Sequence, residues 1–167
     1  MDEAERRAQI ISNEFEQHAR NVFETHSLVA SLVNEHIGGM SWEAIGASEE
    51  LHRFLGEVAH RFPQIRSLWL IDSVGQARAS SAVFPMPSVS VADRDYFVAL
   101  RNNDAGTFIG QPVHGRVFTE DIFNVAQRRL TPGVGFDGVI VVSALPGYFE
   151  TFWDTNVQPR DTVSLVR

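Results

Sequence analysis

The chain has 167 residues, of which 44% are hydrophobic and 21% are charged. This length and composition suit one domain with a buried core, or one domain with an additional long helix. With 14 Lys and Arg residues against 21 Asp and Glu residues, the net charge is -7. That balance argues against binding to nucleic acid or to an anionic membrane surface, since both need a basic footprint. Cysteine is absent, which excludes disulfides, thiol catalysis and thiolate metal sites.

A long helix is predicted for the N-terminal part of the chain. Residues 2–37 contain neither proline nor glycine, and Gly38 and Gly39 then provide a helix end. Heptad-like steps of three and four relate Ala8, Ile11, Phe15, His18, Val22, Thr25, Val29 and Leu32. A second stripe consists of Phe23, Ala30, Val33 and Ile37. We expect one stripe to pack on the domain and the other to form a weak parallel homodimer; the alternative is a single broad face packed on the domain.

Two shorter helices and a β-hairpin are predicted next. Ser41 and Ser48 are suited to cap a short helical turn and a second helix, which Pro63 ends. The apolar, β-rich run at 65–72 predicts a buried strand, and 77–81 its return strand.

The second half of the chain is predicted to be mainly β-structure. Prolines at 85 and 87 indicate an extended connection over 83–91. Asp93 or Asp95 is expected to cap a helix over 96–101. A short strand, a loop or edge strand, and the two strands of a hairpin are expected at 107–109, 110–118, 121–130 and 138–145. A last helical turn from Pro146 is expected to be held to the core by Phe149, Phe152 and Trp153. The fold class is α+β, with a central antiparallel sheet of about five strands and a pocket between sheet and loop.

Four segments in a fixed order carry a family resemblance: DRDYFVALRN at 93–102, GxxIGQPV at 106–113, FNVAQRR at 123–129 and GVIVVSALPGYFETFW at 138–153. This order resembles that of the extracytoplasmic Cache sensor domains, the PAS-like domains of bacterial receptors. The chain is most similar to the membrane-distal half of the double Cache domains of sensor histidine kinases and diguanylate cyclases.

The resemblance implies a domain organisation and a location. Residues 1–39 would form a signalling helix, 40–154 the Cache sensor domain, and 155–167 a linker toward a membrane-proximal region. No apolar run approaches the ~18 residues of a membrane span, so we expect the anchor upstream of the polar start DEAERRAQ. The domain would then be the periplasmic part of an inner-membrane receptor, and any kinase or cyclase activity would belong to other regions of that receptor.

The candidate ligand-binding residues are Arg94, Tyr96, Arg116, Asn124 and Ala126, with Gln127 and Arg128 further along the same strand. A site that buries a carboxylate ligand needs a guanidinium group for bidentate hydrogen bonds, aromatic side chains as walls and a few further hydrogen-bond donors. Arg94 and Tyr96 lie where the family has its pocket lid, and Asn124 and Ala126 share one face of a strand. The alternatives are a surface ion pair for Arg94 and a plain core position for Tyr96.

One departure from the family narrows the expected ligand. Relatives that recognise amino acids have an acidic residue after the last strand, where this chain reads ALPG at 144–147. We therefore expect a small organic acid, or no ligand in this lobe, with no cofactor and no metal. The six histidines, at 18, 26, 36, 52, 60 and 114, form no metal-ligand motif.

Three other functions remain open at this point. One is a cytoplasmic PAS or GAF-type module that senses a cofactor or a partner. Another is a small α+β enzyme that uses Arg94, His114 or Asp121. The third is a purely structural dimerisation lobe.

Overall fold

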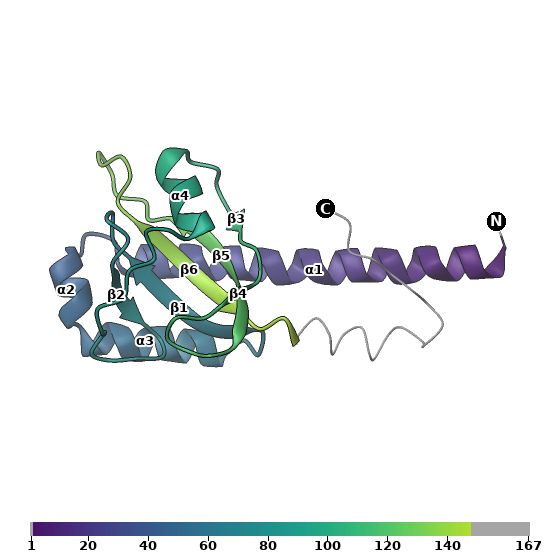
Figure 1. Cartoon of the computed structure of the whole chain (residues 1–167), viewed down its shortest axis with the longest axis horizontal. Coiled ribbons are helices and arrows are strands. Elements are labelled where there is room, and N and C mark those ends of the chain that lie inside the picture. The colour runs from purple at the N-terminus through teal and green to yellow at the C-terminus, as the bar shows by residue number, and fades with distance from the viewer. Residues whose placement is uncertain (1, 148–167) are drawn as a thin grey trace.

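The structure, a computed structural model, describes residues 2–147 apart from the side chain of Phe15. Its centre is an antiparallel sheet in the order β2-β1-β6-β5-β3, with β4 also paired to β5. Figure 1 shows α1 and α3 on one side of this sheet and α4 on the other. The elements are α1 (Glu3–His36), α2 (Trp42–Ala47), α3 (Glu49–His60), β1 (Ile65–Ile71), β2 (Ala77–Ser80), α4 (Asp95–Asn102), β3 (Phe108–Ile109), β4 (Val113–His114), β5 (Asp121–Arg128) and β6 (Val139–Ala144). The predicted fold class is confirmed; the predicted last helical turn and linker lie outside the described residues.

The long first helix is confirmed. It begins with a capping box in which the Asp2 carboxylate accepts from the Glu5 amide while the Glu5 carboxylate accepts from the Asp2 amide. Within the heptad stripe, Val22 and Val29 are buried, whereas Leu32 is exposed. This part of the stripe is therefore mainly a core face, as in the alternative interpretation, and its buried positions cannot also form a dimer seam.

The predicted caps of the two short helices are confirmed, and the predicted cap of α4 is wrong. Ser41 and Ser48 accept hydrogen bonds from the first-turn amides of α2 and α3. At α4 the N-cap residue is Arg94, which makes no side-chain cap bond. Asp93 does not cap because its carboxylate binds Arg116 instead. The Asp95 carboxylate accepts from the Tyr96 amide within the helix.

Strands β5 and β6 are buried on both faces, which determines where the core and the pocket lie. All six residues of β6 are buried. On one face of the sheet, Ile140 and Val142 pack with α1 and α3. On the opposite face, Val139 and Val141 pack with Tyr96, Phe97 and Leu100 of α4. The alternation of a β-strand thus gives the domain two apolar layers, one under each set of helices.

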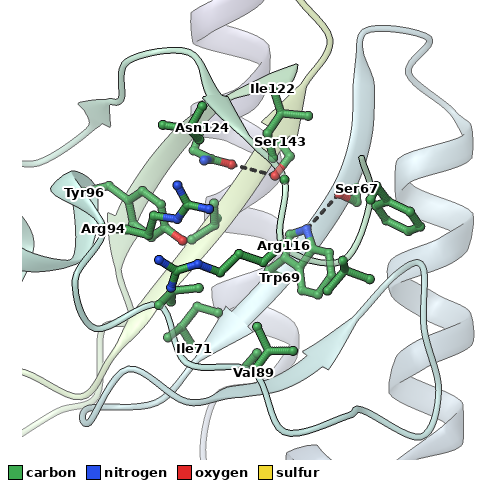
Figure 2. A pocket seen from close by; sticks show the side chains of 17 residues that line it. Ser67, Trp69, Ile71, Val89, Arg94, Tyr96, Arg116, Ile122, Asn124 and Ser143 are labelled. Carbon is green, nitrogen blue, oxygen red and sulfur yellow. Dashed lines mark hydrogen bonds between the residues drawn. The ribbon is translucent and has the colours of Figure 1, made fainter. Parts of the chain in front are cut away.

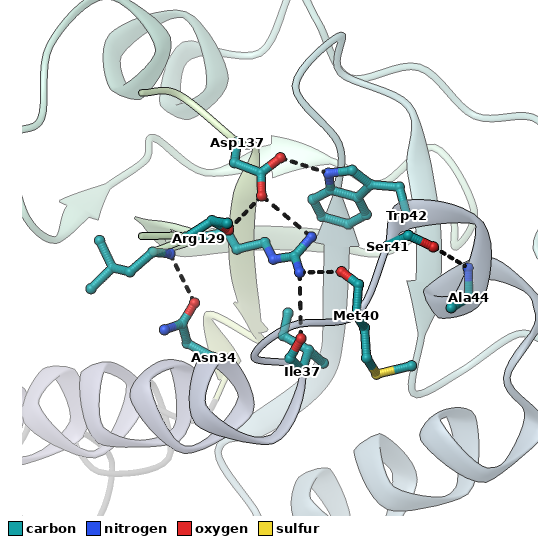
Figure 3. A network of polar contacts seen from close by, with 10 residues as sticks. Asn34, Ile37, Met40, Ser41, Trp42, Ala44, Arg129 and Asp137 are labelled. Atoms are coloured by element: carbon teal, nitrogen blue, oxygen red, sulfur yellow. Dashed lines mark hydrogen bonds and ion pairs between the residues drawn. The ribbon is translucent and has the colours of Figure 1, made fainter. Parts of the chain in front are cut away.

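Arg129 joins the C-terminal end of α1 to the β5–β6 hairpin (Figure 3). Its side chain is almost fully buried and donates to the carbonyl of Met40 at 2.5 Å and to that of Ile37 at 3.4 Å. Its guanidinium lies 4.7 Å from the centre of the Trp42 ring and 3.5 Å from the Asp137 carboxylate. The carboxylate also accepts from the Trp42 indole at 3.0 Å. A buried cation thereby satisfies the Met40 carbonyl and gives a second hydrogen bond to the Ile37 carbonyl, which also accepts from the Met40 amide at 3.0 Å.

We predict that Arg129→Met lowers the free energy of unfolding by about 2–4 kcal/mol, because buried carbonyls and a carboxylate lose their charged partner. Urea denaturation measures the change. Arg53→Met on the exposed side of α3 is the matched control. A loss below about 0.5 kcal/mol, typical of a surface change, would show that the Arg129 contacts do not hold α1 in place.

His26 is a buried titratable group between α1 and the sheet. Its side chain is 0% exposed, and Nδ1 lies 2.6 Å from the carbonyl oxygen of Val22. Nε2 has no hydrogen-bond partner among the described residues. The ring meets Phe123 of β5 edge-on at 6.5 Å between centroids. Burial lowers the pKa of His26 below its ordinary value of 6.5, and the Val22 carbonyl opposes this shift only in part.

The lowered pKa of His26 predicts acid sensitivity. The folded state favours the neutral ring, so the stabilisation is fully present above pH 6.5 and is lost as the pH falls through the folded-state value. We expect the urea midpoint to fall between pH 7.5 and pH 5, and His26→Phe to reduce that fall while keeping the ring contact with Phe123. His60→Gln, an exposed position on α3, is the control. An unchanged fall in His26→Phe would assign the acid sensitivity to other groups.

Candidate ligand-binding site

A partly enclosed cavity of about 60 Å³ lies between the sheet and the loops that cross its α4 side (Figure 2). Strands β1, β5 and β6 form its floor, the start of α4 forms one wall, and the segment 113–118 covers it. The lining residues are Ser67, Trp69, Ile71, Ala77, Val89, Val91, Arg94, Tyr96, Val113, Gly115, Arg116, Val117, Phe118, Ile122, Asn124, Val141 and Ser143.

One end of the cavity presents hydrogen-bond donors. The Tyr96 hydroxyl and the Asn124 amide nitrogen make no hydrogen bond to any other described residue, although both side chains are buried. The Asn124 carbonyl oxygen is occupied, because it accepts from the Ser143 hydroxyl at 2.6 Å. Burial raises the pKa of Tyr96, so its hydroxyl keeps its proton. The half-buried guanidinium of Arg94 completes this donor set, and among the described residues the set has a single acceptor, the His114 carbonyl, which binds Arg94.

The other walls of the cavity are apolar. Trp69, Ile71 and Val141 come from the sheet, and Val89 comes from the extended connection. The Trp69 indole N–H is already bound to the Ser67 hydroxyl at 2.7 Å, so this ring presents only its apolar surface. Phe118 packs edge-on against Trp69, with 6.5 Å between ring centroids. A ligand would therefore meet donors at one end and hydrocarbon at the other.

Three consecutive side chains at the start of α4 hold the covering loop. Asp93 binds the Arg116 guanidinium with both oxygens, at 2.7 and 2.6 Å. Arg94 donates to the carbonyl of His114 at 3.0 Å. The Asp95 carboxylate accepts from the amide of Gln111 at 3.1 Å. The loop therefore depends on the same short segment that supplies Arg94 and Tyr96 to the cavity.

The Asp93–Arg116 pair is strong in geometry although it is exposed. The hydrogen bonds from Arg116 hold the pKa of Asp93 at about 2, well below its ordinary 3.8. The same pairing raises the pKa of Arg116, and Arg116 also donates to the carbonyl of Ser90 at 2.6 Å. The pair thus stays charged at any physiological pH, and Arg116 carries its own counter-ion.

Four of the five predicted site residues line the one cavity: Arg94, Tyr96, Arg116 and Asn124. Ala126 lies on the same strand face as Asn124 but deeper, packed in the core with α4. The two other candidates on β5 point to opposite sides and lie outside the cavity. Gln127 binds Thr107 at 2.8 Å and also Ser27 of α1, and Arg128 donates to the carbonyl of Leu100 at 2.6 Å.

The sequence did not predict that side chains of β1 and β6 line the cavity. Ser67, Trp69 and Ser143 are lining residues that were treated only as parts of apolar strands. A usable signal exists, because Ser67 and Ser143 are polar positions within strands that are otherwise strongly apolar. A buried polar side chain in such a strand needs a partner, and here the partners are Trp69 and Asn124.

Of the three residues named for the enzyme alternative, Arg94 lines the cavity but His114 and Asp121 do not. His114 Nδ1 lies 3.1 Å from the Asp121 carboxylate, but both side chains are exposed, and neither residue is among those that line the cavity. Within residues 2–147, no group of three or more His, Asp and Glu side chains could hold a metal ion. In the same part of the chain, no helix has the length and apolar character needed to cross a bilayer.

Comparison with solved structures places this geometry in a known context. The extracellular domain of the predicted histidine kinase rpHK1S-Z16 superposes with a TM-score of 0.76 at 28% identity, over 86% of this chain and 58% of that one. The sensor domain of the Vibrio cholerae histidine kinase DctB gives 0.65 at 20% identity, over 87% and 57%. The ligand-binding domain of the Campylobacter jejuni chemoreceptor Tlp3, in complex with 4-methylisoleucine, gives 0.67 at 10% identity, over 88% and 60%.

This chain is an extracytoplasmic sensor domain of Cache-like fold. The resemblance seen in the sequence is thereby confirmed at the level of the fold and the sensor class. No family model matches the sequence, and no curated protein does. The chain spans somewhat more than half the length of each of these three solved domains.

Proposed function

We propose that this sensor domain binds a small organic acid and passes the signal to a membrane receptor through α1. The proposal rests on three donor groups, on Arg94, Tyr96 and Asn124, which face one cavity. Within residues 2–147 their only acceptor is a backbone carbonyl that takes one hydrogen bond from Arg94. A ligand carboxylate would supply the missing acceptors, and a guanidinium is the group best suited to bind it.

The lining argues for an acid rather than an amino acid. Structures of the Tlp3 domain contain isoleucine or L-valine, so one domain of this fold binds zwitterions. An ammonium group buried without a carboxylate partner would be strongly unfavourable. The lining residues in the described part of the chain include two arginines and no Asp or Glu. The carboxylate of a zwitterion would therefore bind favourably to the donor groups, whereas its ammonium group would be buried without an anionic partner.

Signal transfer through the sheet is supported by the alternation on β5. Asn124 faces the cavity, while its neighbours Phe123 and Val125 face α1, where Phe23 packs edge-on against Phe123. A ligand that binds Asn124 acts on the strand that α1 rests on. Its effect is limited to the difference in its affinity for two arrangements of helix and sheet.

The parent protein would be a sensor histidine kinase or a diguanylate cyclase anchored in the inner membrane, with the present domain in the periplasm. Support comes from the kinase and chemoreceptor domains of the same fold, which are longer than this chain. Their extra length fits a second, membrane-proximal Cache lobe after residue 154. Catalysis would then lie in other regions of the receptor.

A weak homodimer would use the outer side of α1. Leu28 and Leu32, one turn apart, are 71% and 46% exposed. Ile10 is 57% exposed and lies 18 residues before Leu28, which is five turns and hence the same side of the helix. This stripe shares Leu32 with the heptad stripe expected from sequence but excludes Val22 and Val29, which are buried. In two membrane-anchored copies, α1 helices that lie side by side would bury this exposed apolar stripe.

The first prediction of this proposal concerns Arg94. Small organic acids should raise the melting temperature by binding the folded state, and Arg94→Ala should weaken binding about ten- to a hundredfold, the equivalent of about 1.5–3 kcal/mol for a charge-assisted hydrogen bond. Arg94→Lys should recover only part of the affinity, since an ammonium cannot make the bidentate contact. Thermal shift and isothermal titration measure both effects.

Arg101→Ala is the matched control for this experiment. Arg101 lies on the same helix and is exposed, but it is not a lining residue, so its removal should leave binding unchanged. Equal affinity of the parent and Arg94→Ala for the same acid would contradict the assignment of the cavity as the binding site.

The second prediction concerns assembly. In sedimentation velocity at about millimolar concentration, where weak association becomes visible, Leu28→Glu with Leu32→Glu should reduce self-association. Val74→Glu with Val134→Glu changes two exposed apolar residues in turns and is the control. A parent that stays monomeric, with sedimentation identical to the double variant, would remove the homodimer from the proposal.

A further inference from the structure

We infer that the cavity selects short monocarboxylates over dicarboxylates and amino acids, and that Asp93 is the residue that sets this selectivity. The inference rests on the proposed function, since it specifies the acid that the same site takes. It follows from three features of the site: its charge balance, the arrangement of its polar groups and its size.

The charge balance leaves one binding position for a carboxylate. Two cations, Arg94 and Arg116, line the cavity. Arg116 is neutralised by Asp93 through two hydrogen bonds and gives a third to the Ser90 carbonyl. Three of its five N–H donors are therefore used, and its charge is matched. Arg94 donates one hydrogen bond to the His114 carbonyl and forms no ion pair with a carboxylate in residues 2–147.

The remaining acid in this region does not neutralise Arg94 inside the cavity. The Asp95 carboxylate accepts from the backbone amides of Tyr96 and Gln111 and is not a lining residue. A ligand carboxylate at Arg94 would also be within the reach of the two uncommitted donors, the Tyr96 hydroxyl and the Asn124 amide. A second carboxylate on the ligand would find no unmatched cation among the described lining residues. It would be buried against apolar walls, which is energetically unfavourable.

The size and the far wall of the cavity favour a short apolar or hydroxylated tail. One water needs about 10–15 Å³ of such space, so the 60 Å³ of this cavity holds about four to six water-sized groups. Acetate, propionate and lactate have about four to six non-hydrogen atoms and match that space. Their carboxylate would lie at the donor end, and the tail would lie against Trp69, Ile71 and Val141.

Asp93 controls the selectivity because it determines whether Arg116 is available. Replacing Asp93 by Asn keeps the size of the side chain but removes the counter-ion of Arg116. The cavity would then offer two unmatched guanidinium groups, which is the arrangement that a short dicarboxylate needs. Asp93 thus disfavours dicarboxylates, because its ion pair with Arg116 leaves that guanidinium unavailable to a second ligand carboxylate.

The test is isothermal titration of the whole chain with acetate, propionate, L-lactate, malonate, succinate, L-alanine and L-valine at matched ionic strength. We expect at least one monocarboxylate to bind about tenfold or more tightly than either dicarboxylate or amino acid, the effect of one charge-assisted contact. In Asp93→Asn, the affinity for malonate relative to propionate should rise about tenfold. Asp104→Asn makes the same charge change on the exposed loop after α4 and should leave this ratio unchanged.

The possible outcomes separate the inference from the function beneath it. If a dicarboxylate or an amino acid binds as tightly as the best monocarboxylate and needs Arg94, the proposed function stands and this inference is overturned. The inference is also overturned if Asp93→Asn leaves the ratio of malonate to propionate affinity unchanged. If none of the acids binds, or if binding is indifferent to Arg94→Ala, the proposed function fails together with the inference.

Discussion

The burial of β5 and β6 on both faces is the constraint on which this structure depends. Every residue of β6 is buried, so each side chain must fit either the layer under α1 and α3 or the layer under α4. Among the buried side chains of these two strands, the second layer contains polar groups only at Asn124 and Ser143, which hydrogen-bond to each other. The cavity therefore begins where the apolar packing of α4 ends, and it shares its floor with the core.

This shared floor makes the domain suitable for signalling. A change at Asn124 is separated from α1 only by the thickness of one strand, because Phe123 and Val125 pack on the helix side. The end of α1 is held by the buried Arg129, which reaches from the β5–β6 hairpin to the carbonyls of Ile37 and Met40 (Figure 3). The helix thus meets the same hairpin at two places, one behind the cavity and one at its own C-terminal end.

The covering loop is held in a different way, by polar contacts from a single short segment. Asp93, Arg94 and Asp95 bind residues 116, 114 and 111, so the proposed ligand site and the loop that covers it are linked through adjacent residues. A carboxylate that engages Arg94 acts on a group that already holds the loop. Such a site is able to couple occupancy to loop position without a large rearrangement of the sheet.

The sequence by itself determined the elements and their order. Helix periodicity, the Ser41 and Ser48 caps and the apolar runs of β1, β5 and β6 are local signals, and each produced the expected element. The family resemblance added the region of the pocket, and period-two alternation on β5 placed Asn124 opposite Phe123. Arg94 and Tyr96 were identified because they lie where the resembling family has its pocket lid, and Arg116 because a carboxylate ligand needs a guanidinium group.

The tertiary structure alone decided which of these groups are committed to one another. The pairing of Asp93 with Arg116 joins positions 23 residues apart, and no local rule distinguishes it from the helix cap expected at Asp93. Ala126 has the predicted strand face but lies under α4, because the position of the helix across the sheet determines where core ends and cavity begins. The contributions of Ser67, Trp69 and Ser143 depended in the same way on strand order, which brings β1, β6 and β5 together. Pairwise contacts between distant segments depend on packing geometry, which periodicity and propensity do not contain.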